Sequence, residues 1–209
     1  MDDTVVVALY RHGLTEANKN RAYLGWSDSP LCAEETIKPV CAPIDLLFSS
    51  DLGRCMTTNE RLFPKVKPIL LKELREMNFG AWEGKTYHQL KEDNRYQNWL
   101  NEWQTAKPPE GESFPEFVDR VDRAWNQIQE HTLANSHRRV AIVTHGGVIR
   151  HLLDTFVRSE KSFWDWEVQY AEGIELVFSL EGFRRKDSCI LLQVAHLTEK
   201  RSGSVNNME

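Results

Sequence analysis

Two short apolar runs, each ending abruptly at a histidine, constrain the fold more than any other feature of the sequence. Thr4–Tyr10 is followed by Arg11-His12-Gly13, and Val140–Thr144 is followed by His145-Gly146-Gly147. A continuous apolar run of this length is typical of a strand buried on both faces, as in parallel sheets. Glycines directly after such a strand usually form the turn that leads into a helix. The sequence therefore predicts two buried strands, each with polar chemistry at its carboxyl end.

The rest of the pattern alternates between strands and helices. Further strands are expected at Asp45–Ser49, Lys67–Leu71, Glu175–Leu180 and Cys189–Ala195. Helices are expected over Leu52–Phe63 behind an N-cap at Ser50-Asp51, over Tyr87–Trp103, from Ser113 onwards, and from His145 to about Val157. This alternation predicts an α/β fold with a largely parallel sheet. We expect one domain over residues 1–199, an insert at about 72–111 with little strand signal, and a disordered tail at 200–209.

The helix after Ser113 has the clearest local signals. Ser113 and Glu116 fit a capping box, and Pro115 stands in the first turn. Phe117, Val121, Ala124 and Ile128 then follow at spacings of four, three and four residues. This spacing predicts one apolar face turned toward the core.

Composition excludes several classes of partner. The chain of 209 residues has a net charge of −5, which disfavours nucleic acid as a partner. No apolar run approaches the length that spans a bilayer, and the acidic start lacks the features of a signal peptide. The four cysteines are scattered without a C-x-x-C pair, as in proteins with free thiols. These features favour a cytoplasmic protein, and a homodimer is left open.

The polar residues that follow the strands predict a binding site for an anion. In open α/β sheets, ligands bind at the carboxyl ends of the strands. If the strands are neighbours, Arg11, His12, His145 and Arg54 converge there, and two guanidinium groups beside helix N-termini suit a phosphoryl group. Taken singly, a histidine at a strand end is usually structural, and an arginine on a helix is usually solvated or ion-paired. The coincidence of three strand ends favours the functional interpretation.

The same residues resemble the signature of a known family. Arg11–Asn18 (RHGLTEAN) is similar to the R-H-G-x-T-x-x-N motif of the histidine phosphatase superfamily, the phosphoglycerate-mutase-like enzymes. Further similar segments follow in family order: GWSDSPL at 25–31, SSDLGR at 49–54, LREMNFGAWEG at 74–84, GES at 111–113 and VTHGG at 143–147. The resemblance covers most of the chain. It implies a three-layer α/β/α fold in which the insert at 72–111 covers the active site.

The resemblance also implies roles for individual residues. His12 is expected to be the nucleophile that becomes phosphohistidine, and Glu76 the proton donor to the leaving oxygen. The residues expected to hold the phosphoryl oxygens or the substrate are Arg11, Asn18, Gly25, Arg54, His145 and Gly146. A neutral imidazole is a competent nucleophile near pH 7, and an alkoxide leaving group needs an acid to protonate it. Glu83 is a less favoured alternative acid.

No cofactor or metal is expected, because the arginines and His145 supply the positive charge. Gly80–Thr86 is one residue short of a P-loop and follows no clear strand. His145 and His151 are six residues apart, on different faces of a helix, and no zinc-ligand cluster completes them. The expected ligand is a small phosphate monoester.

The choice of enzyme within the family rests on length and on one segment. Mutases of the family are usually longer, so hydrolysis of phospho-His12 is favoured over return of the phosphoryl group to the substrate. Residues 98–104 and 108–114 look most like the α-ribazole-5′-phosphate phosphatases of cobalamin synthesis, whose flat base an aromatic roof would suit. A broad-specificity phosphatase and a phosphoglycerate mutase are the alternatives. A non-catalytic phospholigand-binding protein is disfavoured, because His12 and Glu76 are both present.

Overall fold

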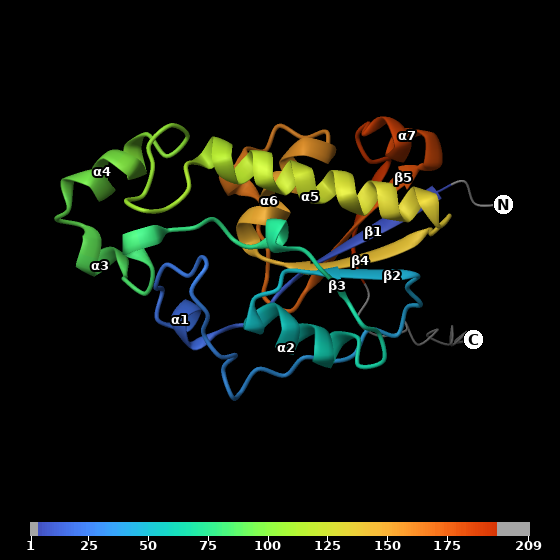
Figure 1. Ribbon diagram of the computed structural model, residues 1–209, viewed down its shortest axis with the longest axis horizontal. Helices are drawn as coiled ribbons and strands as arrows, with labels where there is room; N and C mark the ends of the chain where they lie inside the picture. Colours follow the sequence, from blue (N-terminus) through green and yellow to red (C-terminus); the bar gives the residue numbers. More distant parts are fainter. Residues whose placement is uncertain (1–3, 196–209) are drawn as a thin grey trace, which may run out of the picture.

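Strand β1 (Thr4–Arg11) lies inside a mixed sheet that organises the whole molecule (Figure 1). The computed structural model describes residues 4–195, and its sheet has the strand order β3-β2-β4-β1-β5-β6. The other strands are β2 (Leu46–Ser49), β3 (Ile69–Leu70), β4 (Arg139–Thr144), β5 (Gly173–Ser179) and β6 (Leu191–Val194). Strands β3, β2, β4 and β1 pair in parallel, whereas β5 is antiparallel to both β1 and β6. The expected α/β fold with a largely parallel sheet is confirmed.

The reversal of β5 has a local cause. The loop before it returns to the carboxyl end of β1, where the Ala171 N–H donates to the Arg11 carbonyl and the Arg11 N–H donates to the Glu172 carbonyl. Strand β5 therefore starts where β1 ends and runs back in the opposite direction.

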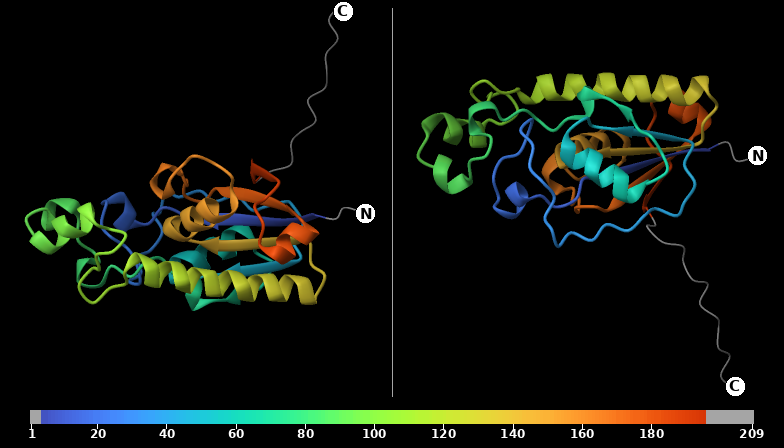
Figure 2. Two further views of the ribbon diagram at one scale, coloured as in Figure 1. Left: turned by 90° about the horizontal axis from the view of Figure 1, so that it is seen from above. Right: turned by 60° about the horizontal axis from the view of Figure 1, so that its bottom comes forward.

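Helices cover both faces of the sheet (Figures 1 and 2). The helix α2 (Gly53–Leu62) and the segment around residues 37–44 pack on one face. The other face is covered by α5 (Phe114–Ala134), α6 (Gly146–Phe156) and α7 (Leu180–Arg185). Three short helices, α1 (Glu16–Lys19), α3 (Tyr87–Leu90) and α4 (Asn94–Asn101), lie beyond one end of the sheet, and single 3₁₀ turns occupy Lys72–Leu74, Gly80–Trp82 and Phe163–Asp165. The result is the expected three-layer α/β/α arrangement.

The long helix α5 follows its sequence signals closely. Ser113 is the N-cap, its side chain and that of Glu116 form the expected capping box, and proline stands in the first turn. The predicted stripe of Phe117, Val121, Ala124 and Ile128 is buried in the main core. Local sequence and tertiary burial agree along this helix.

Two local predictions are wrong. The cap of α2 is not Ser50-Asp51: its N-cap is Leu52, and the carboxylate of Asp28, from a distant loop, accepts from the first N–H groups of the helix. Tyr87–Trp103 is not one helix but two, α3 and α4, because the Asp93 side chain accepts from the Arg95 N–H and starts a new helix.

The segment 72–111 builds a small core of its own. Trp82, Leu90, Tyr96 and Trp99 form an aromatic cluster separate from the two clusters that cover the sheet.

In residues 4–195, no helix has the length and apolarity needed to cross a bilayer. The expected tail at 200–209 lies outside the described residues.

Candidate active site

Three elements meet at the carboxyl edge of the sheet. The backbone N–H of His12 donates to the Thr144 carbonyl (2.9 Å), which continues the β1–β4 ladder past Arg11. The Ser50 N–H donates to the Val143 carbonyl, so the start of α2 is held at the same edge. The predicted neighbours are therefore brought together.

His12 is oriented by its own backbone. The side chain is buried, and Nδ1 lies 2.8 Å from the Gly13 carbonyl. A carbonyl can only accept, so Nδ1 carries the proton and Nε2 keeps a free lone pair. Burial, followed by the charges of Arg54 and Arg11, holds the pKa of His12 well below its usual range. His12 is thus a neutral imidazole at pH 7, as a nucleophile must be.

The loop after His12 is fastened to α2. The Gly13 N–H donates to the Thr58 hydroxyl (2.9 Å), and that hydroxyl donates to the Arg54 carbonyl (2.7 Å). A Cβ at Gly13 would lie 2.8 Å from Cδ1 of Ile37, so a larger residue there would have to displace that side chain. These contacts fix His12 relative to the helix that carries Arg54.

The Arg54 guanidinium is fully buried and largely occupied. Nε donates to His145 Nδ1 (3.3 Å), and Nη2 donates to the Gly25 carbonyl (2.6 Å). Nη1 donates to the Ser27 carbonyl (2.8 Å) and faces the Asp28 carboxylate (3.4 Å). Since a guanidinium has five N–H groups, one on Nη2 remains for a ligand.

His145 is buried beside His12, with ring centroids 5.1 Å apart. Because Arg54 Nε can only donate, His145 Nδ1 accepts, and the proton sits on Nε2, which lies 2.9 Å from the Ser50 hydroxyl. Burial, then the charge of Arg54, holds the pKa of His145 well below its usual range. Both ring nitrogens therefore already have protein partners.

Arg11 presents an unpaired donor to the site. Its Nη1 donates to the Val168 carbonyl (2.6 Å), and its Cζ lies 3.6 Å from the centre of the Tyr170 ring. Its Nε is buried without a hydrogen-bond partner among residues 4–195, and it would lie 3.4 Å from a Cβ at Gly146. A buried cationic N–H without a partner at a helix N-terminus indicates a place for an anion.

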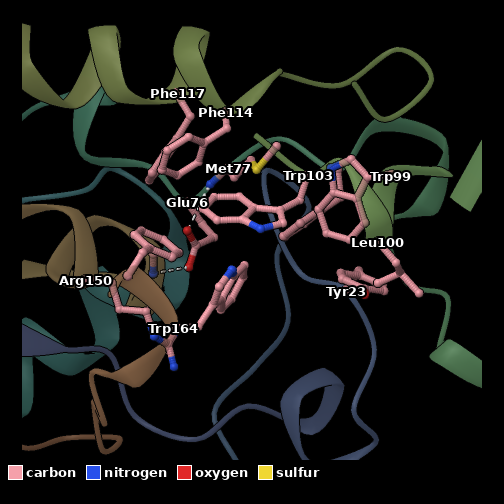
Figure 3. Close-up of a pocket in the computed structure, with 13 residues that line it drawn as sticks. Tyr23, Glu76, Met77, Trp99, Leu100, Trp103, Phe114, Phe117, Arg150 and Trp164 are labelled. Carbon is pink, nitrogen blue, oxygen red and sulfur yellow. Dashed lines mark hydrogen bonds between the residues drawn. The ribbon is translucent and has the colours of Figure 1, made fainter. Parts of the chain in front are cut away.

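Glu76 lies against the same helix N-terminus. Its Oε2 accepts from the Gly147 N–H (2.9 Å) and its Oε1 from the Met77 N–H (3.0 Å), as Figure 3 shows. A Cβ at Gly147 would lie only 2.2 Å from Glu76 Oε1, so glycine makes this approach possible. The helix N-terminus thus has the Arg11 guanidinium at Gly146 and the Glu76 carboxylate at Gly147.

Glu83, the alternative acid, is occupied elsewhere. Its carboxylate accepts from the backbone N–H groups of Trp26, Ser27 and Phe79. It therefore orders the loop whose carbonyls bind Arg54.

The other two expected substrate residues differ in their contacts. The Gly25 carbonyl binds Arg54, and a Cβ there would lie 2.2 Å from the Met77 carbonyl. The Asn18 side chain accepts from the Thr15 hydroxyl (2.8 Å) at the start of α1. Direct contact of Asn18 with a substrate stays a prediction.

An aromatic cavity of about 410 Å³ adjoins Glu76 (Figure 3). Besides Glu76, Gly147 and Arg150, it is lined by Tyr23, Met77, Phe79, Trp99, Leu100, Trp103, Phe114, Phe117, Phe163 and Trp164. Trp99, Trp103 and Trp164 thus lie around this pocket, whereas Trp82 and Trp166 are buried in packing. The cavity can hold a flat apolar group next to the carboxylate.

Sequence reasoning missed three residues of the site. Asp28 caps α2 and faces Arg54, Tyr170 stacks on Arg11, and Trp26 donates its indole N–H to the Glu76 carbonyl (3.0 Å). Asp28 and Trp26 stand within the segment 25–31 quoted above, so the motif was the available signal. Tyr170 stands in an irregular loop with no signal.

Comparison with known proteins agrees with this geometry. The family model described as Histidine phosphatase superfamily (branch 1) matches residues 7–188. The chain is 30% identical to an adenosylcobalamin/alpha-ribazole phosphatase of Escherichia coli K12, over 77% of this chain and 83% of that protein. It is 32% identical to a probable phosphoglycerate mutase of E. coli O1:K1, over 72% and 74%. The crystal structure of an alpha-ribazole phosphatase from Shigella flexneri superposes with a TM-score of 0.76 at 26% identity, covering 93% of this chain and 96% of the other.

The motifs, the converging strand ends and the match over nearly the whole described chain lead to one conclusion. This chain belongs to the histidine phosphatase superfamily (branch 1).

Proposed function

We propose that the protein is a phosphomonoesterase that works through a phosphohistidine at His12, with α-ribazole 5′-phosphate as its preferred substrate. The observation that carries this is the placement of a buried, neutral His12, with Nε2 free, in the field of Arg54 and the unpaired Arg11 Nε. Two guanidinium groups beside a nucleophile suit a dianionic phosphoryl group.

In the first step, His12 Nε2 attacks phosphorus and the bond from phosphorus to the ester oxygen breaks. Glu76, in its carboxyl form, gives its proton to the leaving oxygen, which departs as an alcohol. Arg11 Nε, the remaining Arg54 N–H and the backbone at Gly146 face the charge on the transferring oxygens. In the second step, water attacks the phosphorus and the bond from phosphorus to His12 Nε2 breaks. The proton of the water passes to the Glu76 carboxylate, and phosphate and neutral His12 are released.

His145 has a second function in this scheme. In the free site its Nδ1 accepts from Arg54 Nε. An entering dianion competes for that N–H and, by its charge, favours protonation of His145. The imidazolium then donates from Nδ1 to a phosphoryl oxygen, which is the role that the family resemblance implies for His145.

The substrate assignment rests on the aromatic cavity beside Glu76. A benzimidazole base is flat and apolar, and aromatic side chains bind such rings by stacking and edge-to-face contact. The cavity opens directly from the acid that would protonate the leaving oxygen. Two of the relatives above carry alpha-ribazole phosphatase in their names, which supports the same choice.

The test is phosphate release from a panel of esters in the presence of EDTA. The panel holds α-ribazole 5′-phosphate, ribose 5-phosphate, p-nitrophenyl phosphate and 3-phosphoglycerate. We expect the highest kcat/KM with α-ribazole 5′-phosphate, no effect of the chelator, and an acid-labile phosphoenzyme after a rapid quench. Isomerisation of 3-phosphoglycerate without net phosphate release would instead identify a mutase, and loss of activity in EDTA would refute the metal-free mechanism.

A further inference from the structure

A buried arginine on α5 is connected to the backbone around Glu76. Arg120 is 7% exposed, and its Nε and Nη2 donate to the two carboxylate oxygens of Glu112, each at 2.7 Å. This is a bidentate ion pair, the geometry in which arginine is held most rigidly. The pair is partly buried, with side chains 9% and 15% exposed.

The remaining N–H groups of Arg120 all point to one short segment. Nη1 donates to the carbonyls of Glu73 (2.8 Å) and Arg75 (2.9 Å), and Nη2 donates to that of Glu76 (3.1 Å). With the two bonds to Glu112, the five N–H groups of the guanidinium are all used.

Glu112 binds the backbone on the C-terminal side of Glu76. Its Oε2 also accepts from the Asn78 N–H (2.9 Å), and its own N–H donates to the Asn78 carbonyl (2.9 Å). The backbone is therefore bound on both flanks of Glu76, by Arg120 at 73–76 and by Glu112 at 78.

The segment needs such support because no regular element provides it. Residues 75–79 lie between two 3₁₀ turns, outside helix and strand. An acid displaced by about 1 Å loses much of its effect on the rate. His12 and His145 directly follow strands β1 and β4, whereas Glu76 follows neither a strand nor an α-helix.

We infer that Arg120 is a positioning residue for the acid Glu76, acting through the peptide carbonyls of residues 73–76. This inference rests on the proposed function, since it concerns the step in which Glu76 protonates the leaving oxygen. Arg120 contacts no reacting atom in this scheme. Its effect should therefore fall on protonation of the leaving group and not on phosphoryl binding.

Comparing esters with different leaving groups shows whether Arg120 positions Glu76 or only supports the fold. An alkyl phosphate such as α-ribazole 5′-phosphate needs an acid, whereas p-nitrophenolate leaves without one. We expect Arg120→Met to lower kcat/KM for the alkyl ester about 100-fold, within the range of general acid catalysis, because kcat/KM reports the step in which the leaving group departs. The kcat/KM for p-nitrophenyl phosphate should fall less than about threefold, since its leaving group needs no acid. Arg120→Lys should be intermediate on the alkyl ester, because lysine lacks the planar fork.

Two further variants make the test specific. Arg123→Met removes an exposed arginine from the same helix and should leave both rates unchanged. In a Glu76→Gln background, Arg120→Met should cause no further loss on the alkyl ester, because the two changes disable one function. If Arg120→Met does not fold, Glu112→Gln, which loosens Arg120 without removing it, should show the same selectivity more weakly.

Equal losses of kcat/KM on both esters would overturn the inference, as would a full additional loss in the Glu76→Gln background. Failure of the proposed function looks different. A wild-type enzyme that releases no phosphate from p-nitrophenyl phosphate would refute the phosphatase itself, and the inference with it.

Discussion

The two ends of the site are built on different principles. At the polar end, His12, His145 and Arg54 stand on strand ends and a helix start, and backbone ladders and buried hydrogen bonds fix them. At the aromatic end, most of the cavity wall comes from the segment 76–117 and from the 3₁₀ turn at 163–165, and Tyr23, Gly147 and Arg150 complete it. Contacts between aromatic rings dominate there. The two histidines thus follow strands of the sheet, whereas Glu76 and the aromatic side chains come from helices, 3₁₀ turns and loops outside it.

The largest effect on this comparison is expected from removing the proposed nucleophile, His12. We expect His12→Ala to lower kcat at least about 10⁴-fold for every ester, because removing a nucleophile abolishes the covalent route. Steady-state phosphate release and trapping of the phosphoenzyme measure the effect. His88→Ala, at an exposed histidine in α3, is the matched control and should be silent. Substantial turnover by His12→Ala would reject the assignment.

The two buried histidines at the polar end should make the free energy of unfolding depend on pH. The pKa values of His12 and His145 are depressed in the folded protein, so below the unfolded value of about 6.5 the unfolded chain binds more protons than the folded one. The free energy of unfolding is therefore highest above pH 7 and decreases as the pH falls below that value. The slope reaches about 1.4 kcal/mol per pH unit for each histidine, or up to roughly 100-fold in the unfolding equilibrium over one unit for the two together.

Urea unfolding between pH 7.5 and 5.5 measures this slope. His12→Asn should remove about half of it, because asparagine does not titrate. A flat profile in the wild type would show that the two histidines do not resist protonation when folded.

A substitution at the aromatic end should affect only substrates that carry the base, whereas His12→Ala affects every ester. Trp103 packs against Phe114 (4.6 Å between ring centroids) and lies near Phe163 and Trp164. We expect Trp103→Ala to lower kcat/KM for α-ribazole 5′-phosphate about tenfold, through loss of one or two aromatic contacts. The kcat/KM for ribose 5-phosphate, which lacks the base, should be unchanged.

Tyr87→Ala, at an exposed tyrosine that does not line the cavity, is the control for Trp103→Ala. Equal losses for both substrates would mean that the cavity wall supports the polar end and does not select the base.

The same contrast explains what the sequence could predict. The buried strands, the polar residues after them and the capped helix α5 depend on local patterns, and the structure has them at nearly the expected positions. The break between α3 and α4 was missed because a continuous apolar spacing outweighed the capping signal of Asp93.

The contacts that position the site residues depend on pairs far apart in the chain. Asp28 replaces the expected cap of α2, Tyr170 stacks on Arg11, and Arg120 holds the backbone of residues 73–76. Each side chain alone is an ordinary surface type, and its function follows only from which backbone groups the fold brings to it. The motifs therefore predicted the candidate reacting groups, while the groups that orient them could be found only in the tertiary structure.

The smallest effect on the rate is expected from a substitution of Trp26, which contacts the backbone of Glu76 between the two ends. The Trp26 indole N–H donates to the Glu76 carbonyl, which also accepts from Arg120. Trp26→Phe keeps an aromatic ring but removes that donor. One hydrogen bond contributes about 0.5–1.5 kcal/mol, so kcat for α-ribazole 5′-phosphate should fall roughly two- to tenfold while KM stays constant.

Rates on p-nitrophenyl phosphate decide the meaning of the Trp26→Phe result. If they are unchanged, the indole acts on the acid, as we infer for Arg120. A rise in KM for the aromatic ester with kcat intact would place Trp26 with the aromatic end instead, because weakened binding alone raises KM. Since the Trp26 ring also lies 5.1 Å from the Arg75 guanidinium, an Arg75→Met variant tests whether that stacking, and not the hydrogen bond, sets the indole's position.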